Sequence, residues 1–390
     1  MKIVLMNVVY DKGSTGHIVK TLFEELKSNG HDVTVLYGRG KKQNSTEIIK
    51  KTYELESKIH HLISKITGNM YGGMFFSTKR IIKTLKRIKP DVVNLHCING
   101  YFVNISKLLK WLADNKIKTI LTMHADFMMT GGCGYAVDCQ KYLTSECKNC
   151  EKMHEINGRF SLNRTYKTYF NFKEAIKSFN KDKIKVTCVS PWLTERYRNS
   201  PIYKDIDVDC ILNPVDDVFF TEAKENPYST NNNVLYVTPD IHDSVKSGYL
   251  IKDLAKSRPD LNFTIICIKK VEFKHDCPNI NFIGGGVSRE KLRDFYYFAD
   301  SVVLLSKRET FSMVVAEALC CGTKVCGFKC GGAESIAIKP YGNFVEYSNI
   351  ELLSKLLTSE NYSKEYIKKA SFNAYNKAKI TQQYLKEFEF

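Results

Sequence analysis

Two glutamates, Glu309 and Glu317, stand at the two ends of the run ETFSMVVAE in the second half of the chain. An apolar strand pattern ends at Ser306 just before them, and a helix pattern starts near Thr310. Glu309 is therefore expected in the loop at the positive end of the helix dipole. Glu317 falls on the inward side of the helix, where a carboxylate needs a polar partner such as the hydroxyl pair of a ribose. The alternative is a capping glutamate followed by a second one by chance.

A glycine-containing loop, GSTGH from Gly13 to His17, joins the first strand pattern to the first helix pattern. Glycines at this position let a ligand approach the backbone, and the N–H groups of a helix N-terminus attract anions such as phosphates. The spacing is not the GxGxxG fingerprint, which argues against a nicotinamide cofactor. An ordinary turn between strand and helix is the alternative.

Four of the 13 cysteines lie close together in the stretch CGYAVDCQKYLTSECKNC, and most of the others fall in apolar runs typical of buried thiols in a reducing compartment. The last two of the four form a C-x2-C pair, which is the spacing of structural zinc knuckles. The stretch is poor in apolar residues, so a metal would supply order that packing does not. Unligated or redox-labile thiols are the alternative. The predicted zinc ligands are Cys133, Cys139, Cys147 and Cys150, with His154 as a replacement for one of them.

The chain carries 58 Lys and Arg against 42 Asp and Glu, a net charge of +16. Such a charge favours an anionic partner, which is a nucleic acid, an acidic membrane or a phosphate-bearing substrate. The helix expected over residues 77–89 has isoleucines and a leucine on one side and lysines and arginines on the other. An anionic membrane surface would suit this helix, and an ordinary solvated surface helix is the alternative.

The elements that must position these residues alternate regularly between strand and helix, which predicts two α/β domains with parallel sheets, each Rossmann-like. Strands are predicted at 3–9, 31–38, 91–97, 118–124 and 185–190 in the first half, and at 234–238, 262–268, 279–285, 301–306 and 324–328 in the second.

The predicted domains cover residues 1–212 and 213–371, with a helix over about 372–390 packing back on the first, and residues 221–233 are the likeliest loop or linker. Open α/β sheets bind ligands at the carboxyl ends of their strands, so a nucleotide-type ligand is expected between the two domains. No apolar stretch reaches the roughly 18 residues of a membrane helix, and the N-terminus reads as a buried strand, so a cytoplasmic protein is expected.

The motifs along the chain resemble those of retaining glycosyltransferases of family 4, which have the GT-B fold. The E-x7-E spacing followed by ALCCGTKVCGFKCGGAESI resembles the family's signature. The segments CILNPVDDVFF, DSVKSGYL and NFIGGGVSREKLRDFYYFADSVVLLS resemble other family passages in the family's order. In the first half, DVVNLHCING and TILTMHADFMMTGGCGY resemble a subgroup that acts in surface-polysaccharide assembly.

This resemblance implies transfer of a sugar from a UDP- or GDP-sugar to a glycan or polyprenyl-linked acceptor, with no catalytic cofactor and no nucleic-acid partner. The enzyme would be cytoplasmic or peripheral at the inner face of the cell membrane. Glu309 would contact the donor sugar, and His124 would line the acceptor side near the anomeric centre. The remaining donor-binding residues would be Gly13, Gly16, Lys246, Gly285, Thr310, Phe311, Ser312, Glu317, Gly331 and Gly332, and His96, Asn99 and Asp126 would lie on the acceptor side.

The sequence departs from the family pattern at the donor-phosphate site, where an arginine usually precedes the lysine. Asp240 and Val245 occupy the candidate positions, so Lys246 is expected to act with another cation, Lys269 or Lys270. Two other functions are open. A sugar-nucleotide epimerase would use the same fold without an acceptor, and a basic zinc protein would bind nucleic acid through its charge and cysteine cluster.

Overall fold

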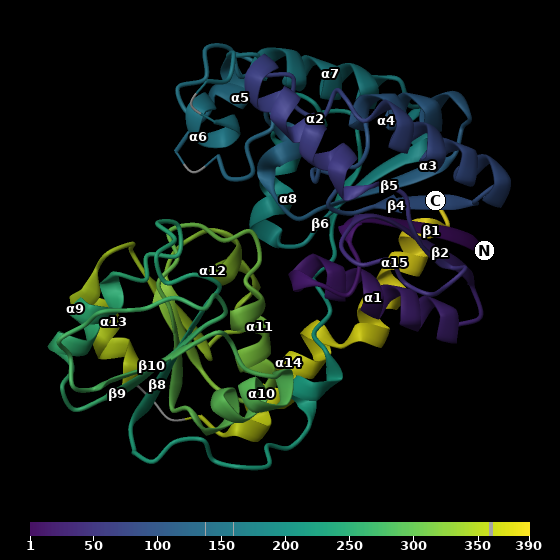
Figure 1. The fold of residues 1–390 in the computed structure, drawn as a ribbon. Coiled ribbons are helices and arrows are strands. Elements are labelled where there is room, and N and C mark those ends of the chain that lie inside the picture. Colours follow the sequence, from purple (N-terminus) through teal and green to yellow (C-terminus); the bar gives the residue numbers. More distant parts are fainter. Residues whose placement is uncertain (137, 159, 359–361) are drawn as a thin grey trace. The chain divides into compact units, whose positions relative to one another are not determined.

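The chain divides into two α/β units in the computed structural model, which describes residues 1–136, 138–158, 160–358 and 362–390 (Figure 1). The first unit comprises Met1–Ile211 together with Ile380–Phe390, and the second comprises Leu212–Lys379. The expected boundary at 212 lies one residue from this division, whereas the return to the first unit begins at 380 and not at about 372.

The first unit is built on a seven-stranded parallel sheet with the order β3-β2-β1-β4-β5-β6-β7. On one side of β1 the sheet continues with β2 and β3, and on the other side of β4 it continues with β5, β6 and β7. The direction in which the chain adds strands therefore reverses between β1 and β4. The strands are β1 (Lys2–Val9), β2 (Asp32–Arg39), β3 (Ile48–Lys50), β4 (Val92–Leu95), β5 (Lys118–Met123), β6 (Ile184–Cys188) and β7 (Val208–Cys210).

Helices connect the strands of the first unit, and several of them place an apolar face on the sheet. Helix α1 shows the pattern, since Ile18, Leu22 and Leu26 recur at helical spacing and are all buried. The helices are α1 (Gly13–Ser28), α2 (Glu54–Thr67), α3 (Phe75–Ile88), α4 (Ile105–Asp114), α5 (Lys141–Thr144), α6 (Met153–Asn157), α7 (Thr165–Lys177) and α8 (Pro191–Arg198), with the short 3-10 helices η1 (Asp126–Met129) and η2 (Lys181–Lys183).

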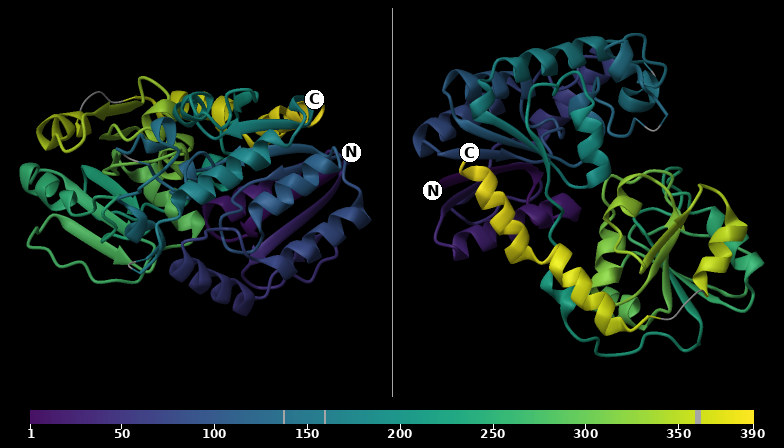
Figure 2. Two further views of the ribbon diagram at one scale, coloured as in Figure 1. Left: turned by 90° about the horizontal axis from the view of Figure 1, so that it is seen from above. Right: turned by 180° about the vertical axis from the view of Figure 1, so that it is seen from behind.

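The last helix, α15 (Lys377–Phe388), brings the C-terminus to the first unit and lies beside the N-terminal elements (Figure 2). Glu387 forms an ion pair with Lys185 at 3.0 Å, and Gln382 Nε2 donates to Asn29 Oδ1 at 3.2 Å. The apolar side of α15 is buried, including Ile380 and Tyr384. Burial of this face explains why a segment distant in sequence completes the first unit.

The second unit is built on a six-stranded parallel sheet with the order β10-β9-β8-β11-β12-β13. Its chain reversal lies between β8 and β11. The strands are β8 (Asn233–Thr238), β9 (Asn262–Cys267), β10 (Ile280–Gly284), β11 (Ser301–Leu304), β12 (Val325–Phe328) and β13 (Gly342–Val345). The helices are η3 (Asp217–Phe220), α9 (Leu250–Ser257), α10 (Arg289–Phe298), α11 (Met313–Cys320), α12 (Gly332–Ile336), α13 (Ile350–Leu357) and α14 (Lys364–Tyr375). Residues 221–232, which the sequence presented as a loop or linker, are a loop inside this unit.

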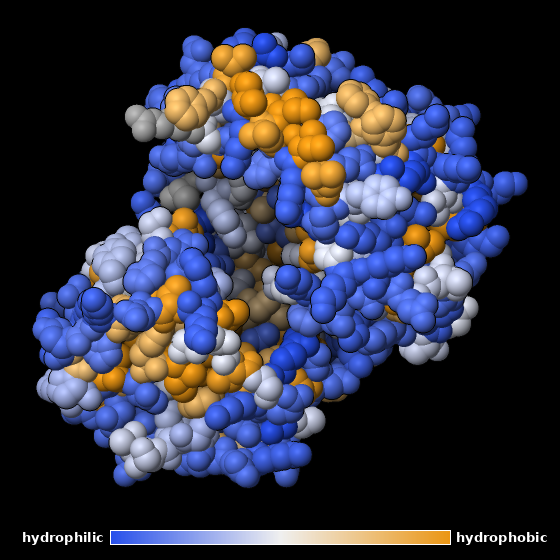
Figure 3. Space-filling view, in the orientation of Figure 1, coloured by the Kyte–Doolittle hydropathy of each residue, from blue (hydrophilic) through white to orange (hydrophobic). Residues whose placement is uncertain are grey.

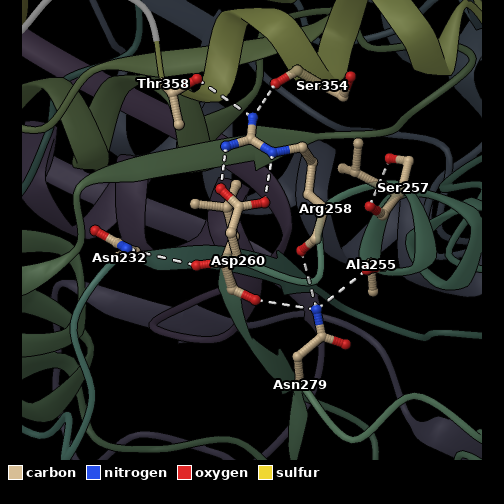
Figure 4. A network of polar contacts seen from close by, with 10 residues as sticks. Asn232, Ala255, Ser257, Arg258, Asp260, Asn279, Ser354 and Thr358 are labelled. Carbon is tan, nitrogen blue, oxygen red and sulfur yellow. Dashed lines mark hydrogen bonds and ion pairs between the residues drawn. The ribbon is translucent and has the colours of Figure 1, made fainter.

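A polar network ties together the amino ends of the strands in the second unit (Figure 4). Arg258 binds both carboxylate oxygens of Asp260, at 2.8 and 2.6 Å, and donates to the carbonyl of Ser354 at 2.7 Å. The side-chain amide of Asn279 donates to the carbonyls of Ala255 and Leu261. These contacts hold the amino edge of the sheet in place. The candidate site residues of this unit lie at the opposite, carboxyl edge.

Within the described part of the chain, no helix combines the length and the apolar character that crossing a membrane requires.

Candidate functional site

The carboxyl edge of the second sheet holds several of the predicted donor-binding residues near the chain reversal between β8 and β11. Loops that follow such a pair of strands turn away from each other and leave room for a ligand at the edge of the sheet. The loop after β8 holds Lys246, and the loop after β11 holds Glu309. The strand order therefore places two residues that are 63 positions apart at the same point.

Lys246 and Glu309 form an ion pair, with 2.7 Å between Nζ and Oε1. Both side chains are largely buried, at 19% and 11% exposure. The same carboxylate oxygen accepts a hydrogen bond from the Ser306 hydroxyl at 2.7 Å. A lysine and a glutamate held in this way offer one cationic and one anionic group to a ligand that carries both phosphates and hydroxyls.

Backbone hydrogen bonds hold the loop of Glu309 between its neighbours. The N–H of Lys307 donates to the carbonyl of Val245 at 2.7 Å, and the N–H of Glu309 donates to the carbonyl of Cys330 at 3.0 Å. These bonds join the loops after β8, β11 and β12. The position of the Glu309 carboxylate is thus set by three strands of the sheet.

Gly331 and Gly332 serve close backbone packing. The N–H of Gly331 donates to the Glu334 carboxylate at 2.8 Å, and the N–H of Gly332 donates to the carbonyl of Glu309, also at 2.8 Å. A Cβ on Gly332 would lie 2.2 Å from the carbonyl carbon of Thr310. The family resemblance implies donor-binding roles for these two glycines, and in this structure both of their amides have protein acceptors.

Helix α11 starts at Met313, three residues later than the sequence suggested, because the turn before it has an unusual backbone. Ser312 has a φ of +84°, a conformation that residues other than glycine rarely adopt. No side-chain hydrogen bond caps this helix. Its first N–H groups and the buried turn residues Thr310, Phe311 and Ser312 therefore form a helix terminus suited to an anion.

Glu317 lies on α11 and accepts a hydrogen bond from the Tyr296 hydroxyl at 3.2 Å. Burial raises the pKa of Glu317 to about 7, and the positive charge of Arg289 opposes that rise. A carboxylate that is desolvated near neutral pH gains from a ligand that donates hydrogen bonds to it. Tyr296 was not among the predicted site residues, and its only sequence cue was a place in the aromatic run DFYYFA.

The second cation expected beside Lys246 is Lys269 or Lys270, and both of these lysines are exposed in this structure. Lys269 pairs with Asp240 at 2.7 Å on the exposed part of the edge. Arg308 directly precedes Glu309 and is partly exposed, and the sequence prediction did not name it.

Gly285 follows β10 with a φ of +95°, and its N–H donates to the carbonyl of Cys267.

In the first unit, two histidines meet at the carboxyl edge of the sheet. His96 follows β4 and His124 follows β5, and the distance between His96 Nδ1 and His124 Nε2 is 3.1 Å. Asn94 donates through Nδ2 to Thr122 Oγ1 at 2.8 Å, so its Oδ1 accepts from His96 Nε2 at 2.8 Å. His96 Nδ1 is then the acceptor for the Nε2–H of His124. A chain of hydrogen bonds that begins in the sheet thus orients His124.

Both histidines are neutral at neutral pH. Burial lowers the pKa of His96 well below its ordinary value, and it lowers the pKa of His124 to about 4. His96 is almost fully buried and lies behind His124, which is partly exposed. Only His124 of the pair is placed to touch a bound molecule, whereas His96 was expected to contact the acceptor as well.

Asp126 is expected on the acceptor side, but its carboxylate is engaged inside the first unit. Its carboxylate is fully buried and binds Arg196 with both oxygens, at 3.2 and 3.1 Å. It also accepts the N–H of Ala136 at 2.8 Å. Asp126 thus holds the following loop against α8, and a buried ion pair with these partners has no free oxygen for an acceptor. Asn99 lies in the loop after β4 and is partly exposed.

The glycine loop of the first unit follows β1, next to the chain reversal. Gly13 has a φ of +64° and opens α1, and Gly16 lies in the first turn of that helix. A Cβ on Gly16 would come within 3.2 Å of Val9. Lys12 at the N-cap makes no side-chain capping bond. This helix terminus therefore has the form expected of an anion site.

The four clustered cysteines line one cavity of about 460 Å³ in the first unit. The N–H of Gly131 donates to Cys147 Sγ at 3.2 Å. Burial raises the pKa of Cys133 to about 11 and that of Cys147 to about 12. Among the residues that the structure describes, no three His, Cys, Asp or Glu side chains are arranged to hold a metal ion.

Comparison with known proteins gives a consistent result. The family model described as Glycosyltransferase Family 4 matches residues 15–219, and the model described as Glycosyl transferases group 1 matches residues 249–377. The putative colanic acid biosynthesis glycosyl transferase WcaC of Escherichia coli (strain K12) is 21% identical over 167 residues. This match spans 40% of the present chain and 40% of WcaC.

Solved structures resemble the chain over its whole length. Sucrose-phosphate synthase from Thermosynechococcus elongatus has a TM-score of 0.68 at 14% identity, with 100% of this chain and 98% of that chain covered. HepE from Anabaena in complex with UDP has a TM-score of 0.63 at 12% identity, with both chains covered completely. The catalytic domain of starch synthase IV from Arabidopsis thaliana, bound to ADP and acarbose, has a TM-score of 0.61 at 11% identity, with 100% and 98% covered.

Proposed function

The chain belongs to glycosyltransferase family 4 and has the GT-B fold, and we propose that it transfers a sugar from a nucleotide-diphosphate sugar, with retention of configuration. The acceptor is a glycan or a polyprenyl-linked sugar in surface-polysaccharide assembly, in line with the partial match to WcaC. The observation that carries the proposal is the buried Lys246–Glu309 pair at the chain reversal of the second sheet. The complexes of similar proteins with UDP and ADP support a nucleotide-sugar donor.

Cleavage of the sugar–diphosphate bond leaves negative charge on the diphosphate, and cations and oriented N–H groups stabilise that charge. Lys246 supplies one cation, and we assign Arg308 as the second, in place of the arginine that family members carry elsewhere. The uncapped N-terminus of α11 contributes N–H donors. Catalysis needs no metal ion in this scheme.

Two carboxylates bind different parts of the donor. Glu309 binds hydroxyls of the transferred sugar, and Glu317 binds the ribose. The raised pKa of Glu317 supports this role, since two hydroxyl donors compensate a carboxylate that burial would otherwise disfavour.

His124 lines the acceptor side. A histidine with a pKa of about 4 is neutral at neutral pH and is a weak base, so it positions the acceptor without removing a proton. The acceptor hydroxyl attacks from the same face as the departing group, and its proton passes to the leaving phosphate oxygen. No protein nucleophile takes part.

Zinc is a separate proposal. Cys133, Cys139, Cys147 and Cys150 line one cavity, and we propose that their thiols move into ligand positions when a structural zinc ion binds, since no three of the described His, Cys, Asp or Glu side chains have that arrangement in this structure. Binding would displace protons from thiols whose pKa values are raised. Metal analysis of the purified protein tests it: one zinc per chain that is lost in a Cys147→Ser, Cys150→Ser variant supports the site. Zinc-free protein with four titratable thiols supports the alternative of unligated cysteines.

A cytoplasmic location is part of the proposal. All 13 cysteines are free in this structure, which fits a reducing compartment. A nucleotide-sugar donor is also available there.

The function is tested with a thermal-shift screen of UDP-, GDP-, ADP- and CMP-sugars, because a true donor stabilises the folded protein. The donor found in this way is then used in transfer assays with the wild type and with Glu309→Ala and Lys246→Ala. Loss of transfer in both variants, with the folded state retained, supports the assignment. Unchanged activity in both variants would contradict the assignment. Product formed from the donor alone, without an acceptor, would indicate an epimerase.

A further inference from the structure

Helix α2 exposes its apolar side and buries its polar side. Ser57 and Ser64 are buried, whereas five aliphatic side chains on the opposite side are 46 to 69% exposed. Figure 3 shows them as a continuous hydrophobic band on the first unit. They recur at the spacing of one helix face and are Leu55, Ile59, Leu62, Ile63 and Ile66.

Polar contacts fix the rotation of α2 about its own axis. The Ser64 hydroxyl is 2.9 Å from the Tyr101 hydroxyl, and Asn157 Nδ2 donates to the carbonyl of Ser64 at 2.7 Å. The His61 ring stacks on Tyr101 with 4.7 Å between centroids. These partners occupy the inward side of α2. The helix therefore cannot turn its isoleucines and leucines inward without losing all of these contacts.

The charges around the apolar band are almost all positive. Residues 51–90 contain nine Lys and Arg against two glutamates. Both glutamates are neutralised by ion pairs, Glu54 with Lys50 at 2.9 Å and Glu56 with Arg80. Lys58 and Lys65 on α2 are exposed. The neighbouring helix α3, which the Arg80–Glu56 pair joins to α2, adds exposed Lys79, Lys83, Lys86 and Arg87.

We propose that α2, together with the cationic side of α3, docks the first unit on an anionic lipid bilayer. An aliphatic stripe on one helix with lysines beside it is the form taken by helices that lie in a membrane interface. The excess of cations matches an anionic lipid surface, and each cation there adds to the attraction. The residues of this surface take no part in the proposed transfer reaction, and the proposal does not depend on that reaction.

This assignment alters the sequence-based expectation for residues 77–89. That helix carries the expected cations, but Ile81 and Leu85 face the core of the unit. Apart from Phe75 and Phe76 in its first turn, which are 58% and 71% exposed, this helix would offer a membrane mainly charge. The apolar half of the contact comes from α2, which the sequence pattern did not single out.

The experiment is flotation of the full chain with vesicles of phosphatidylcholine, with and without phosphatidylglycerol. The wild type is expected to float with the anionic vesicles and to be released in part by high salt. Leu62→Asp, at a side chain that is 60% exposed, is expected to bind these vesicles about tenfold more weakly. Leu352→Asp on α13 is the matched control, at 45% exposure, and is expected to float like the wild type.

Light scattering and a nucleotide thermal shift accompany flotation for each variant. Wild-type protein that stays with the soluble fraction, or Leu62→Asp protein that floats as well as the wild type, would overturn the proposal. A wild-type dimer that Leu62→Asp converts to a monomer, without vesicle binding, would assign the band to a second copy of the chain instead. A wild-type melting temperature in Leu62→Asp, measured without nucleotide, would show that the variant is folded.

Discussion

At the scale of single residues, Lys246 and Glu309 neutralise each other at the carboxyl edge of the second sheet. A diphosphate that approaches this edge competes with Glu309 for the ammonium group. Glu309 is then left with hydrogen-bond capacity for sugar hydroxyls, while Ser306 still holds one of its oxygens. Under the proposed function, the pair couples phosphate binding to sugar binding.

A first prediction concerns the cation of this pair. Lys246→Met is expected to weaken binding of the donor nucleotide diphosphate by roughly tenfold to a hundredfold, because a charge-assisted bond to phosphate is lost. Calorimetric titration measures the effect. Lys256→Met is the control, since Lys256 is an exposed lysine on α9 that pairs with Asp276. Equal losses in the two variants would show a general effect of charge and no specific site.

A second prediction concerns Glu317 and pH. Its folded-state pKa of about 7 lies above the ordinary value of 4.5, so the folded protein binds this proton more tightly than the unfolded chain does. The stability linked to Glu317 is therefore complete below about pH 4.5 and is lost as the pH rises through 7.

Glu317→Gln removes this dependence. The variant is expected to be more stable than the wild type at pH 8 by about 1–3 kcal/mol, with little difference at pH 4.5. Its nucleotide affinity is expected to fall, because the ribose loses a carboxylate. Urea denaturation at the two pH values measures the first effect. A pH-independent difference would show that the buried carboxylate is not the cause.

At the scale of elements, both sheets place their candidate site residues in loops that follow strands at or next to a chain reversal. In the second unit, three such loops are bonded to one another through the backbones of Lys307, Glu309 and Gly332. The position of the carboxylate depends on this bonding more than on the conformation of any one loop.

A third prediction follows for Gly332. Gly332→Ala would place a Cβ 2.2 Å from Thr310, so the loops after β11 and β12 must separate. Donor affinity and transfer are expected to fall by at least about tenfold, as small displacements at a binding site are costly. Gly134→Ala, where a Cβ meets nothing within 4 Å, is the control and should retain both. Wild-type kinetics in Gly332→Ala would contradict the proposed coupling of the loops.

At the scale of the whole molecule, the chain leaves the first unit at Ile211 and returns to it at Ile380. The returning helix buries five side chains in the first unit, namely Ile380, Thr381, Tyr384, Leu385 and Phe388. The C-terminus is therefore part of the hydrophobic core of the N-terminal unit.

A fourth prediction is that truncation after Lys379 destabilises the first unit by on the order of 5 kcal/mol, because the apolar area buried by α15 is lost. Guanidinium denaturation, with separate transitions for the two units, measures the effect. Removal of Glu389 and Phe390 alone is the milder comparison. If the truncated chain kept the wild-type midpoint, the returning helix would have no part in the core.

The sequence by itself determined the α/β class, the parallel sheets and most strand positions, and the solved structures with the GT-B fold confirm the fold. It also determined the family, through motifs that the family models match. These features are local: an apolar β-branched run bounded by turn residues favours a strand, and the residue after a strand lies at the carboxyl edge. The placement of Glu309 and His124 at such edges followed from this rule.

Only the tertiary structure decided which of these residues meet. Strand order brings Lys246 to Glu309 and His96 to His124, and it joins the buried Asp126 to Arg196. Packing also decided that the polar side of α2 faces inward, against its hydrophobic pattern. Local patterns do not fix strand order or the partner of a polar side chain, because these depend on contacts between residues far apart in the sequence.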